Sequence, residues 1–127
     1  MIKELKTIEK IDENTQIKYW RLKMPMMSDR DNVVEMITKD MGDGNTYVQC
    51  KSIERDDVPE LPGVVRCFLF VRAFIRDSKE VENALDFTEI TCFNMKGYFP
   101  GRLLNMIIAS ETQREFGNMY KYLKEKN

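Results

Sequence analysis

The sequence predicts an α+β fold in which about six antiparallel strands form a sheet and one long helix follows at the C-terminal end. Two observations carry this prediction. After Pro100 no proline interrupts the chain and apolar residues recur at helical spacing. Before it, apolar residues alternate in short runs that are separated by segments rich in Gly, Pro, Asp and Asn. With 127 residues, 43% of them hydrophobic, residues 1–127 are expected to form one domain with one core.

The first two strands are predicted at residues 2–11 and 16–24, on either side of a short polar turn. In the second run the apolar residues change face between Tyr19 and Trp20. This change predicts either a β-bulge or a strand that is buried on both faces. Residues 25–31, which begin with a proline and continue with Ser, Asp and Arg, are predicted to turn the chain.

A second hairpin is predicted from residues 33–41 and 46–53. It surrounds the tetrapeptide Gly42-Asp43-Gly44-Asn45, whose Gly and Asn residues tolerate a positive φ. Residues 54–63 hold two prolines and five charged residues and are predicted to be a loop.

Residues 64–76 give the strongest strand signal in the chain. Alternate residues from Val65 to Ile75 are all apolar, and the opposite face alternates between arginine and phenylalanine. After a polar connection, residues 86–95 are predicted to be the sixth strand.

The last element is predicted to be a helix that begins near Pro100, because a proline is tolerated in the first helical turn. Its first two turns are mostly apolar, whereas residues 110–115 are polar. We therefore expect Leu104, Ile107 and Ile108 to face the sheet.

Composition narrows the classes of function. The net charge of −1 predicts no overall field that would attract nucleic acid. The three widely spaced cysteines suggest buried thiols in a reducing compartment, and the charged first residues lack the apolar core of a signal peptide. The sequence holds no apolar stretch long enough to cross a membrane. A soluble, cytoplasmic protein is therefore expected.

The sequence offers little support for a catalytic site or a metal-binding site. The chain contains no histidine, which removes Ser-His-Asp and Cys-His mechanisms and the commonest metal ligand. The segment around Asp43 resembles part of a calcium-binding loop, but its oxygen ligands do not alternate correctly and no glutamate closes it. We expect no enzyme activity, no cofactor and no metal.

Aromatic and arginine residues instead suggest an apolar pocket with a few polar groups, which is the usual composition of a small-molecule site. The residues concerned are Trp20, Met24, Met36, Arg66, Phe68, Phe70, Arg72, Phe74 and Arg76. The alternative is that the aromatic residues form the core and the arginines a solvated face, and composition alone favours this second interpretation.

Four segments, in order and spacing, resemble the START (StAR-related lipid-transfer) domain family: a Tyr-Trp strand, an S-x-R-D motif, a Val-Arg strand and a D-x-x-G-x-[IFL]-P motif before the last helix. In this chain they are Tyr19-Trp20, Ser28-Asp29-Arg30-Asp31, Val65-Arg66 and Asn94-Met95-Lys96-Gly97-Tyr98-Phe99-Pro100. The resemblance implies a helix-grip fold, a curved antiparallel sheet around a long C-terminal helix, that holds one lipid without chemistry. It adds Leu104 and Ile108 to the expected pocket lining and makes Arg66 and Arg72 candidates for contact with a lipid head group.

The chain departs from the family pattern in three ways. Asn94 stands where the family has Asp. The acid–base pair of the sterol-binding members falls near Met24 and Met36, neither of which is charged, and the strand that holds Trp20 looks more like that of the phosphatidylcholine-transfer branch. The N-terminal third or more of the usual domain is expected to be absent.

The leading hypothesis is therefore a lipid-binding or lipid-transfer module, for a phospholipid-like ligand rather than a sterol, with transient contact with membrane surfaces and no nucleic-acid partner. The alternative is a structural or interaction fragment that forms homo-oligomers through an uncovered groove. An enzyme of the wider Bet v 1-like superfamily is a third reading, for which the sequence offers no catalytic group.

Overall fold

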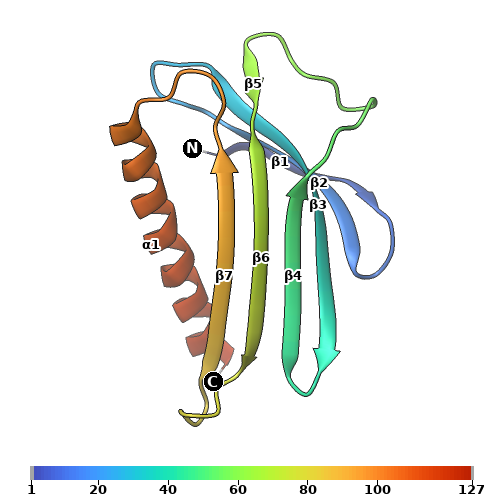
Figure 1. Ribbon diagram of the computed structural model, residues 1–127, viewed down its shortest axis with the longest axis vertical. Helices are drawn as coiled ribbons and strands as arrows, with labels where there is room; N and C mark the ends of the chain where they lie inside the picture. The colour runs from blue at the N-terminus through green and yellow to red at the C-terminus, as the bar shows by residue number, and fades with distance from the viewer. Residues whose placement is uncertain (1, 127) are drawn as a thin grey trace. The chain divides into compact units, whose positions relative to one another are not determined.

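The computed structural model describes residues 2–126, apart from the side chains of residues 122, 123 and 126. The chain divides into two compact units, Met1–Lys96 and Gly97–Asn127, and each is described by itself. The first unit holds the strands β1 (Ile2–Lys10), β2 (Thr15–Leu22), β3 (Asp29–Gly42), β4 (Asn45–Ser52), β5 (Val64–Arg66), β6 (Phe68–Asp77) and β7 (Leu85–Asn94) (Figure 1). The second unit holds the helix α1 (Gly101–Lys126).

The strands form one sheet in the order β1-β2-β3-β4-β6-β7, in which every neighbouring pair is antiparallel. The predicted α+β class, with an antiparallel sheet and a C-terminal helix, is confirmed. The predicted hairpin at residues 42–45 is also confirmed: Gly42, Asp43 and Gly44 all have positive φ, and Asn45 Nδ2 donates to the Gly42 carbonyl at 3.1 Å.

The strand predicted at residues 64–76 is divided in two. Its first part, β5, is parallel to the beginning of β3, so the prediction of a purely antiparallel sheet is wrong at this point. The pairing is available because β4 ends at Ser52 and leaves this part of β3 without its antiparallel neighbour. Cys67 then forms the break, with its N–H donating to the Asp31 carbonyl at 2.9 Å.

The strand β3 begins at Asp29, four residues before the predicted start at residue 33. The turn predicted for residues 25–31 therefore extends too far. Arg30, Asp31 and Asn32 belong to the strand and are 0–2% exposed. Charged residues at such positions are tolerated only where other groups satisfy them by hydrogen bonds or ion pairs.

The sheet is curved. Trp20 of β2 and Phe93 of β7 have ring centroids 6.5 Å apart, whereas in a flat sheet these strands would lie roughly 14–19 Å apart. The face that carries Trp20 and Phe93 is therefore the concave face, and we call the opposite one the convex face. Within β2, Tyr19 is buried and Trp20 on the opposite face is half-buried. The pairing of β2 with β3 is regular, whereas its pairing with β1 shifts register twice, between Ile2 and Glu4 and between Thr7 and Glu9 of β1.

One cluster of buried core residues in the first unit lies on the convex face. Ile17, Tyr19 and Val33 are 0–3% exposed and form one cluster. Ile53 and Val58, which belong to the loop between β4 and β5, pack against this cluster. The loop predicted for residues 54–63 therefore covers the apolar part of β2 and β3.

The helix α1 starts where the sequence predicts. The N–H groups of Leu103 and Leu104 donate to the Pro100 carbonyl at 3.0 and 3.1 Å, which fixes the first turn. Within α1, Ile107 is 7% exposed, whereas Phe116 and Tyr120 are 57% and 65% exposed. No helix among the described residues is both long and apolar enough to cross a membrane.

Candidate functional site

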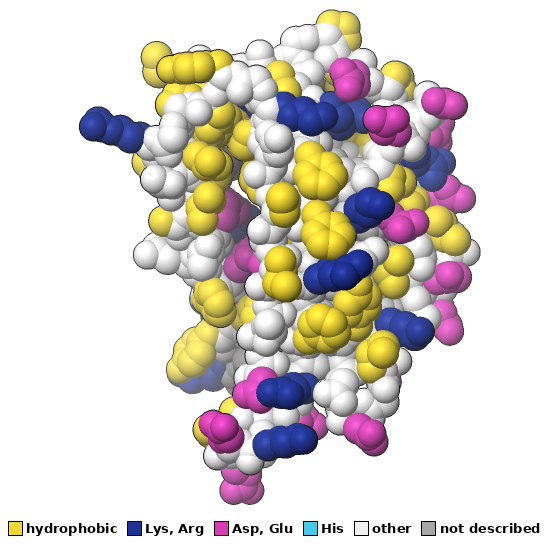
Figure 2. Space-filling view, viewed as in Figure 1, with side chains coloured by type: hydrophobic (Ala, Val, Ile, Leu, Met, Phe, Trp, Pro, Cys, Tyr) yellow, Lys and Arg dark blue, Asp and Glu magenta, His cyan; other side chains and the backbone are white. Residues whose placement is uncertain are grey.

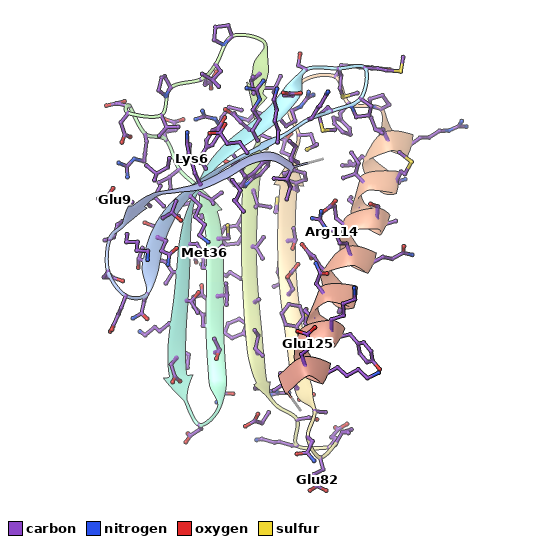
Figure 3. All side chains as sticks on the ribbon, turned by 180° about the vertical axis from the view of Figure 1, so that it is seen from behind. Lys6, Glu9, Met36, Glu82, Arg114 and Glu125 are labelled. Atoms are coloured by element: carbon purple, nitrogen blue, oxygen red, sulfur yellow. The ribbon has the colours of Figure 1, made fainter. Side chains whose placement is uncertain are left out.

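The concave face carries apolar and polar side chains in rows, and the strand register defines its members. Met36 of β3 pairs with Cys50 of β4, which pairs with Val71 of β6, which pairs with Thr91 of β7. Partners in a β-ladder point to the same side of the sheet, so these four side chains form a row across the concave face, with Met36 of β3 labelled in Figure 3. The rows on either side add Val34, Val48 and Ala73.

The structure separates the predicted pocket residues into two groups. Trp20 and Met36 lie on the concave face. Phe68, Phe70 and Phe74 lie on the convex face, because Phe70 pairs with Lys51, whose β3 partner Glu35 is the partner of Ile17. The predicted constellation is therefore not brought together on one side of the sheet. Met24 lies beyond the end of β2 and is 3% exposed.

The two predicted helix residues belong to the second unit. Leu104 is half-buried, and Ile108 is 51% exposed. Their contribution to a pocket, and the expectation that this helix faces the sheet, remain predictions.

The two candidate head-group arginines are already engaged by the protein. Arg72 projects from the convex face, where its guanidinium lies 5.1 Å from the centroid of the Phe70 ring and donates to Gln49 Oε1 at 3.1 Å. Figure 2 shows hydrophobic side chains interleaved with Lys and Arg side chains along this side of the sheet. Phe74 projects from the same face of β6 as Arg72, and it is 52% exposed.

Arg66 forms a buried ion pair. Its Nε and Nη2 donate to the two carboxylate oxygens of Asp31 at 2.7 and 3.2 Å, and its guanidinium also donates to the carbonyls of Val58 and Pro59 at 3.2–3.3 Å. Tyr19 Oη donates to Asp31 at 3.1 Å. The Asp31 carboxylate raises the pKa of Arg66, whereas burial and then Asp31 raise the pKa of Tyr19 to about 12. This cluster fastens the β4–β5 loop to the sheet and leaves Arg66 little freedom to bind a ligand.

Arg30 is a second buried arginine, and sequence reasoning gave it no role beyond the S-x-R-D motif. Its Nε donates to the Met95 carbonyl at 2.9 Å, its Nη2 to the Lys96 carbonyl at 3.1 Å, and its Nη1 to the Ser28 carbonyl at 2.5 Å. The residues that follow β7 are thereby attached to the start of β3.

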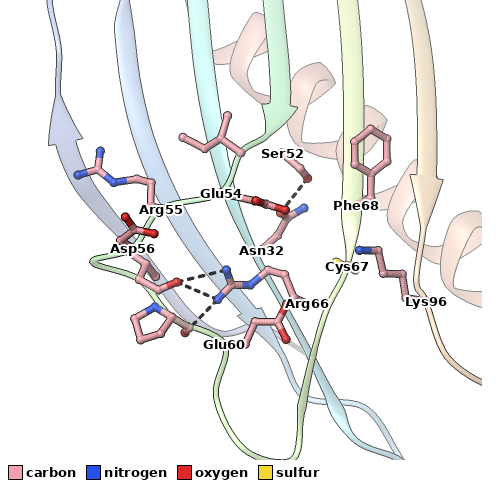
Figure 4. Close-up of a pocket in the computed structure, with 13 residues that line it drawn as sticks. Asn32, Ser52, Glu54, Arg55, Asp56, Glu60, Arg66, Cys67, Phe68 and Lys96 are labelled. Atoms are coloured by element: carbon pink, nitrogen blue, oxygen red, sulfur yellow. Dashed lines mark hydrogen bonds between the residues drawn. The ribbon is translucent and has the colours of Figure 1, made fainter.

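A surface pocket of about 470 Å³ lies where β4 leaves the sheet (Figure 4). Its charged and polar lining residues are Asn32, Ser52, Glu54, Arg55, Asp56, Glu60, Arg66 and Lys96. Asn32 is fully buried, and its Oδ1 accepts from Ser52 Oγ at 2.8 Å, while its Nδ2 has no hydrogen-bond partner among the described residues. Leu69 N–H donates to the same Ser52 Oγ, so the Ser52 hydroxyl hydrogen is free to donate to Asn32. Sequence reasoning missed Asn32, because an Asn after two charged residues reads as part of a turn.

Side chains that could bind a metal are not clustered in the part of the chain that the structure describes. No cluster of three or more Cys, Asp or Glu side chains there has metal-binding geometry. Cys50 and Cys67 are buried free thiols, and burial raises their pKa values to about 11 and about 12.

Comparison with known proteins gives a family. A model of the START domain matches residues 1–126. Among solved structures, human StAR-related lipid transfer protein 5 is 19% identical with a TM-score of 0.74, over 98% of this chain and 61% of that one. Human STARD10 is 18% identical with a TM-score of 0.77, over 96% of this chain and 49% of that one. The human StarD13 (DLC2) lipid transfer and protein localization domain is 25% identical with a TM-score of 0.65, over 79% of this chain and 51% of that one.

A comparison with curated proteins found no match. This chain spans 49–61% of the length of the three solved structures. The family match covers nearly the whole chain, and the curved antiparallel sheet with its C-terminal helix is the arrangement shared with those structures. The chain therefore belongs to the START domain family.

Proposed function

We propose that this chain binds one lipid against the concave face of its sheet and carries or presents it without catalysing a reaction. The observation that supports this most is the match of a START domain model to residues 1–126, together with an apolar row on that face formed by Met36, Cys50 and Val71. Burial of acyl chains against such a surface is favourable by about 25 cal/mol per Å² of apolar area. Lipid uptake requires transient contact with a membrane surface.

A phospholipid-like ligand is preferred over a sterol in this proposal. Met24 and Met36 stand near the positions where the resemblance places the acid–base pair of sterol-binding members, and neither can donate a strong hydrogen bond to a sterol hydroxyl. The predicted relationship to the phosphatidylcholine-transfer branch is supported by the likeness of the strand that holds Trp20 to that branch. A cytoplasmic location is proposed from the free cysteines alone.

The lipid site can be tested on one strand. Thr88 and Thr91 are both exposed residues of β7, and their partners Phe74 and Val71 place them on the convex and concave faces respectively. We expect Thr91→Trp to fill space on the concave face and to reduce the lipid recovered after incubation with phospholipid vesicles by about tenfold or more. The matched variant Thr88→Trp is expected to bind lipid as the unmodified chain does. Quantitative mass spectrometry of the protein-bound lipid measures both.

Equal loss in the two variants, or no loss in either, would remove the concave face as the site. Repeated recovery of lipid-free protein from the unmodified chain, at every vesicle composition tried, would contradict lipid binding itself.

A second candidate function is a homo-oligomeric interaction module, because the described sheet ends in two edge strands. β1 and β7 each pair on one side only within the described sheet, and Ile90 of β7 is 64% exposed. An unpaired edge beside an exposed apolar residue is a template for adding a strand from a second copy.

For this candidate we expect sedimentation at micromolar concentration to show a dimer or larger species. Proline at Phe87 or Thr88 would remove a backbone donor from β7, and because N–H groups alternate in direction along a strand, one of these two adjacent positions points its N–H away from β6. That variant is expected to be monomeric. A compact monomer of the unmodified chain, unchanged by either proline, is the result that would exclude the candidate.

A further inference from the structure

The pocket where β4 leaves the sheet contains a hydrogen-bond donor that the described residues do not use. Asn32 lies on the wall of this pocket of about 470 Å³ and is 0% exposed. Its Oδ1 accepts from Ser52 Oγ at 2.8 Å, whereas its Nδ2 has no hydrogen-bond partner among the described residues. Because buried donors are nearly always paired, this group favours a ligand that brings an acceptor oxygen.

The Asn32 amide is held in one orientation by the strands on either side. Ser52 is the last residue of β4, and its Oγ accepts from the backbone N–H of Leu69 near the start of β6 at 2.8 Å. The hydroxyl hydrogen of Ser52 is thereby directed to Asn32 Oδ1, so Nδ2 lies on the other side of the amide. Figure 4 draws Asn32 in the middle of the residues that line the pocket. A donor that is already fixed loses little conformational entropy when a ligand binds.

The charges around the pocket disfavour an anionic ligand. Its charged lining residues are three basic and three acidic ones: Arg55, Arg66, Lys96, Glu54, Asp56 and Glu60. Both arginines form salt bridges with carboxylates that do not line the pocket, those of Glu9, Asp57 and Asp31. The three acidic lining residues form no salt bridge within the described part of the chain. Three carboxylates therefore face the single ammonium of Lys96, and this excess of negative charge attracts a cation.

The donor and the negative charge lie at different depths. Asn32 is fully buried, whereas the three acidic lining residues are exposed. The pocket thus offers a fixed N–H donor at its inner end and carboxylates toward its mouth.

We propose that this pocket binds a small amide that also carries an amino group, with the carbonyl oxygen accepting from Asn32 Nδ2 and the ammonium facing the carboxylates at the mouth. Amino-acid amides are the simplest molecules of this class. The site is separate from the proposed lipid site, because Met36, Cys50 and Val71 do not line this pocket. Its ligand is recognised by one hydrogen bond and by charge, so a molecule that lacks either group binds less well.

The test observes Asn32 directly. The isotopically labelled, unmodified chain is titrated with glycinamide, and the Nδ2–H signals of Asn32 and the backbone N–H signal of Leu69 are followed by NMR. We expect both sets of signals to shift and to reach saturation. Acetamide, which lacks the ammonium, and methylammonium, which lacks the carbonyl, are each expected to bind about tenfold more weakly or less well still. Acetate is expected not to bind, because the carboxylates repel it.

Two variants separate the two ends of the pocket. Asn32→Leu removes the donor with little change in side-chain volume, and it is expected to weaken glycinamide binding by about tenfold or more, as measured at Leu69. Glu54→Gln is expected to weaken glycinamide binding by about threefold and to leave acetamide binding unchanged. Asn14→Leu and Glu13→Gln are the matched controls, because both residues are exposed in the turn between β1 and β2. Neither control is expected to change binding.

The alternative role for the Asn32 amide is to hold a buried water molecule. Under that alternative glycinamide leaves the Asn32 and Leu69 signals in place, and the inference is overturned. Equal affinity for glycinamide and acetamide, or displacement of glycinamide by phospholipid vesicles, overturns it as well. If Asn32→Leu does not fold, the preference of the unmodified chain for glycinamide and its reduction in Glu54→Gln decide the question.

Discussion

Replacing Arg66 with methionine is expected to lower the free energy of unfolding by about 3–5 kcal/mol. The Asp31 side chain is 1% exposed, and Arg66 supplies both of its charged hydrogen bonds. Methionine keeps the apolar stem but leaves a carboxylate buried with only the Tyr19 hydroxyl as a side-chain donor. The same change also frees the carbonyls of Val58 and Pro59, so the β4–β5 loop loses its hydrogen bonds to this guanidinium.

Chemical denaturation of the unmodified chain and the variant measures this effect. Arg76→Met is the control, because Arg76 forms an ion pair with Asp86 in which the side chains are 58% and 40% exposed. Exposed pairs of this kind contribute about 0–1 kcal/mol. If both variants lost the same small amount, Asp31 would have to be accessible to water, and the buried pair would not be the attachment described above.

Ile17→Ala is expected to have the second largest effect, a loss of about 2–5 kcal/mol. Ile17 is 1% exposed and packs with Tyr19 and Val33 beneath the β4–β5 loop, so the smaller side chain leaves a cavity that its rigid neighbours cannot fill. A β-branched residue is also lost from a strand that pairs on both sides.

Thermal and urea unfolding of Ile17→Ala should be compared with Ile90→Ala, where the isoleucine is 64% exposed on β7. The second change is expected to cost about 0.5 kcal/mol or less. Similar losses at the two positions would mean that the convex cluster is not the core of the sheet.

Much of the fold could be predicted because local signals agreed with one another. Alternating apolar residues set off by turns gave the hairpins, and Pro100 followed by helical periodicity gave the start of α1. These patterns involve residues that are close in sequence, so they can be recognised without knowledge of tertiary contacts.

The start of β3 could not be predicted in the same way. Arg30, Asp31 and Asn32 look like surface residues, and their burial depends on partners far along the chain. The parallel pairing of β5 has the same origin, because it uses an edge of β3 that exists only where β4 has ended. Hydrogen bonds between polar groups that are far apart in the chain produce no periodic pattern in the sequence.

The candidate site shows a related limit. Alternation within one strand assigned Phe68, Phe70 and Phe74 to a common face correctly. Whether that face also holds Trp20 depends on the register across β3, β4 and β6, and a shift of one residue reverses the answer.

The buried charges of β3 also constrain the order in which the protein can be completed during synthesis. Asp31 precedes Arg66 by 35 residues, and Arg30 precedes the Met95 carbonyl by 65. At a translation rate of roughly 5–20 residues per second, these partners are made about 2–7 and 3–13 seconds after β3 itself. Until then the β2–β3 and β3–β4 hairpins can form only with a carboxylate that lacks Arg66 and a guanidinium that lacks the Met95 and Lys96 carbonyls, so both groups must remain in water. The nascent sheet therefore stays open at that end, and it closes only when the residues that follow its last strand have been made.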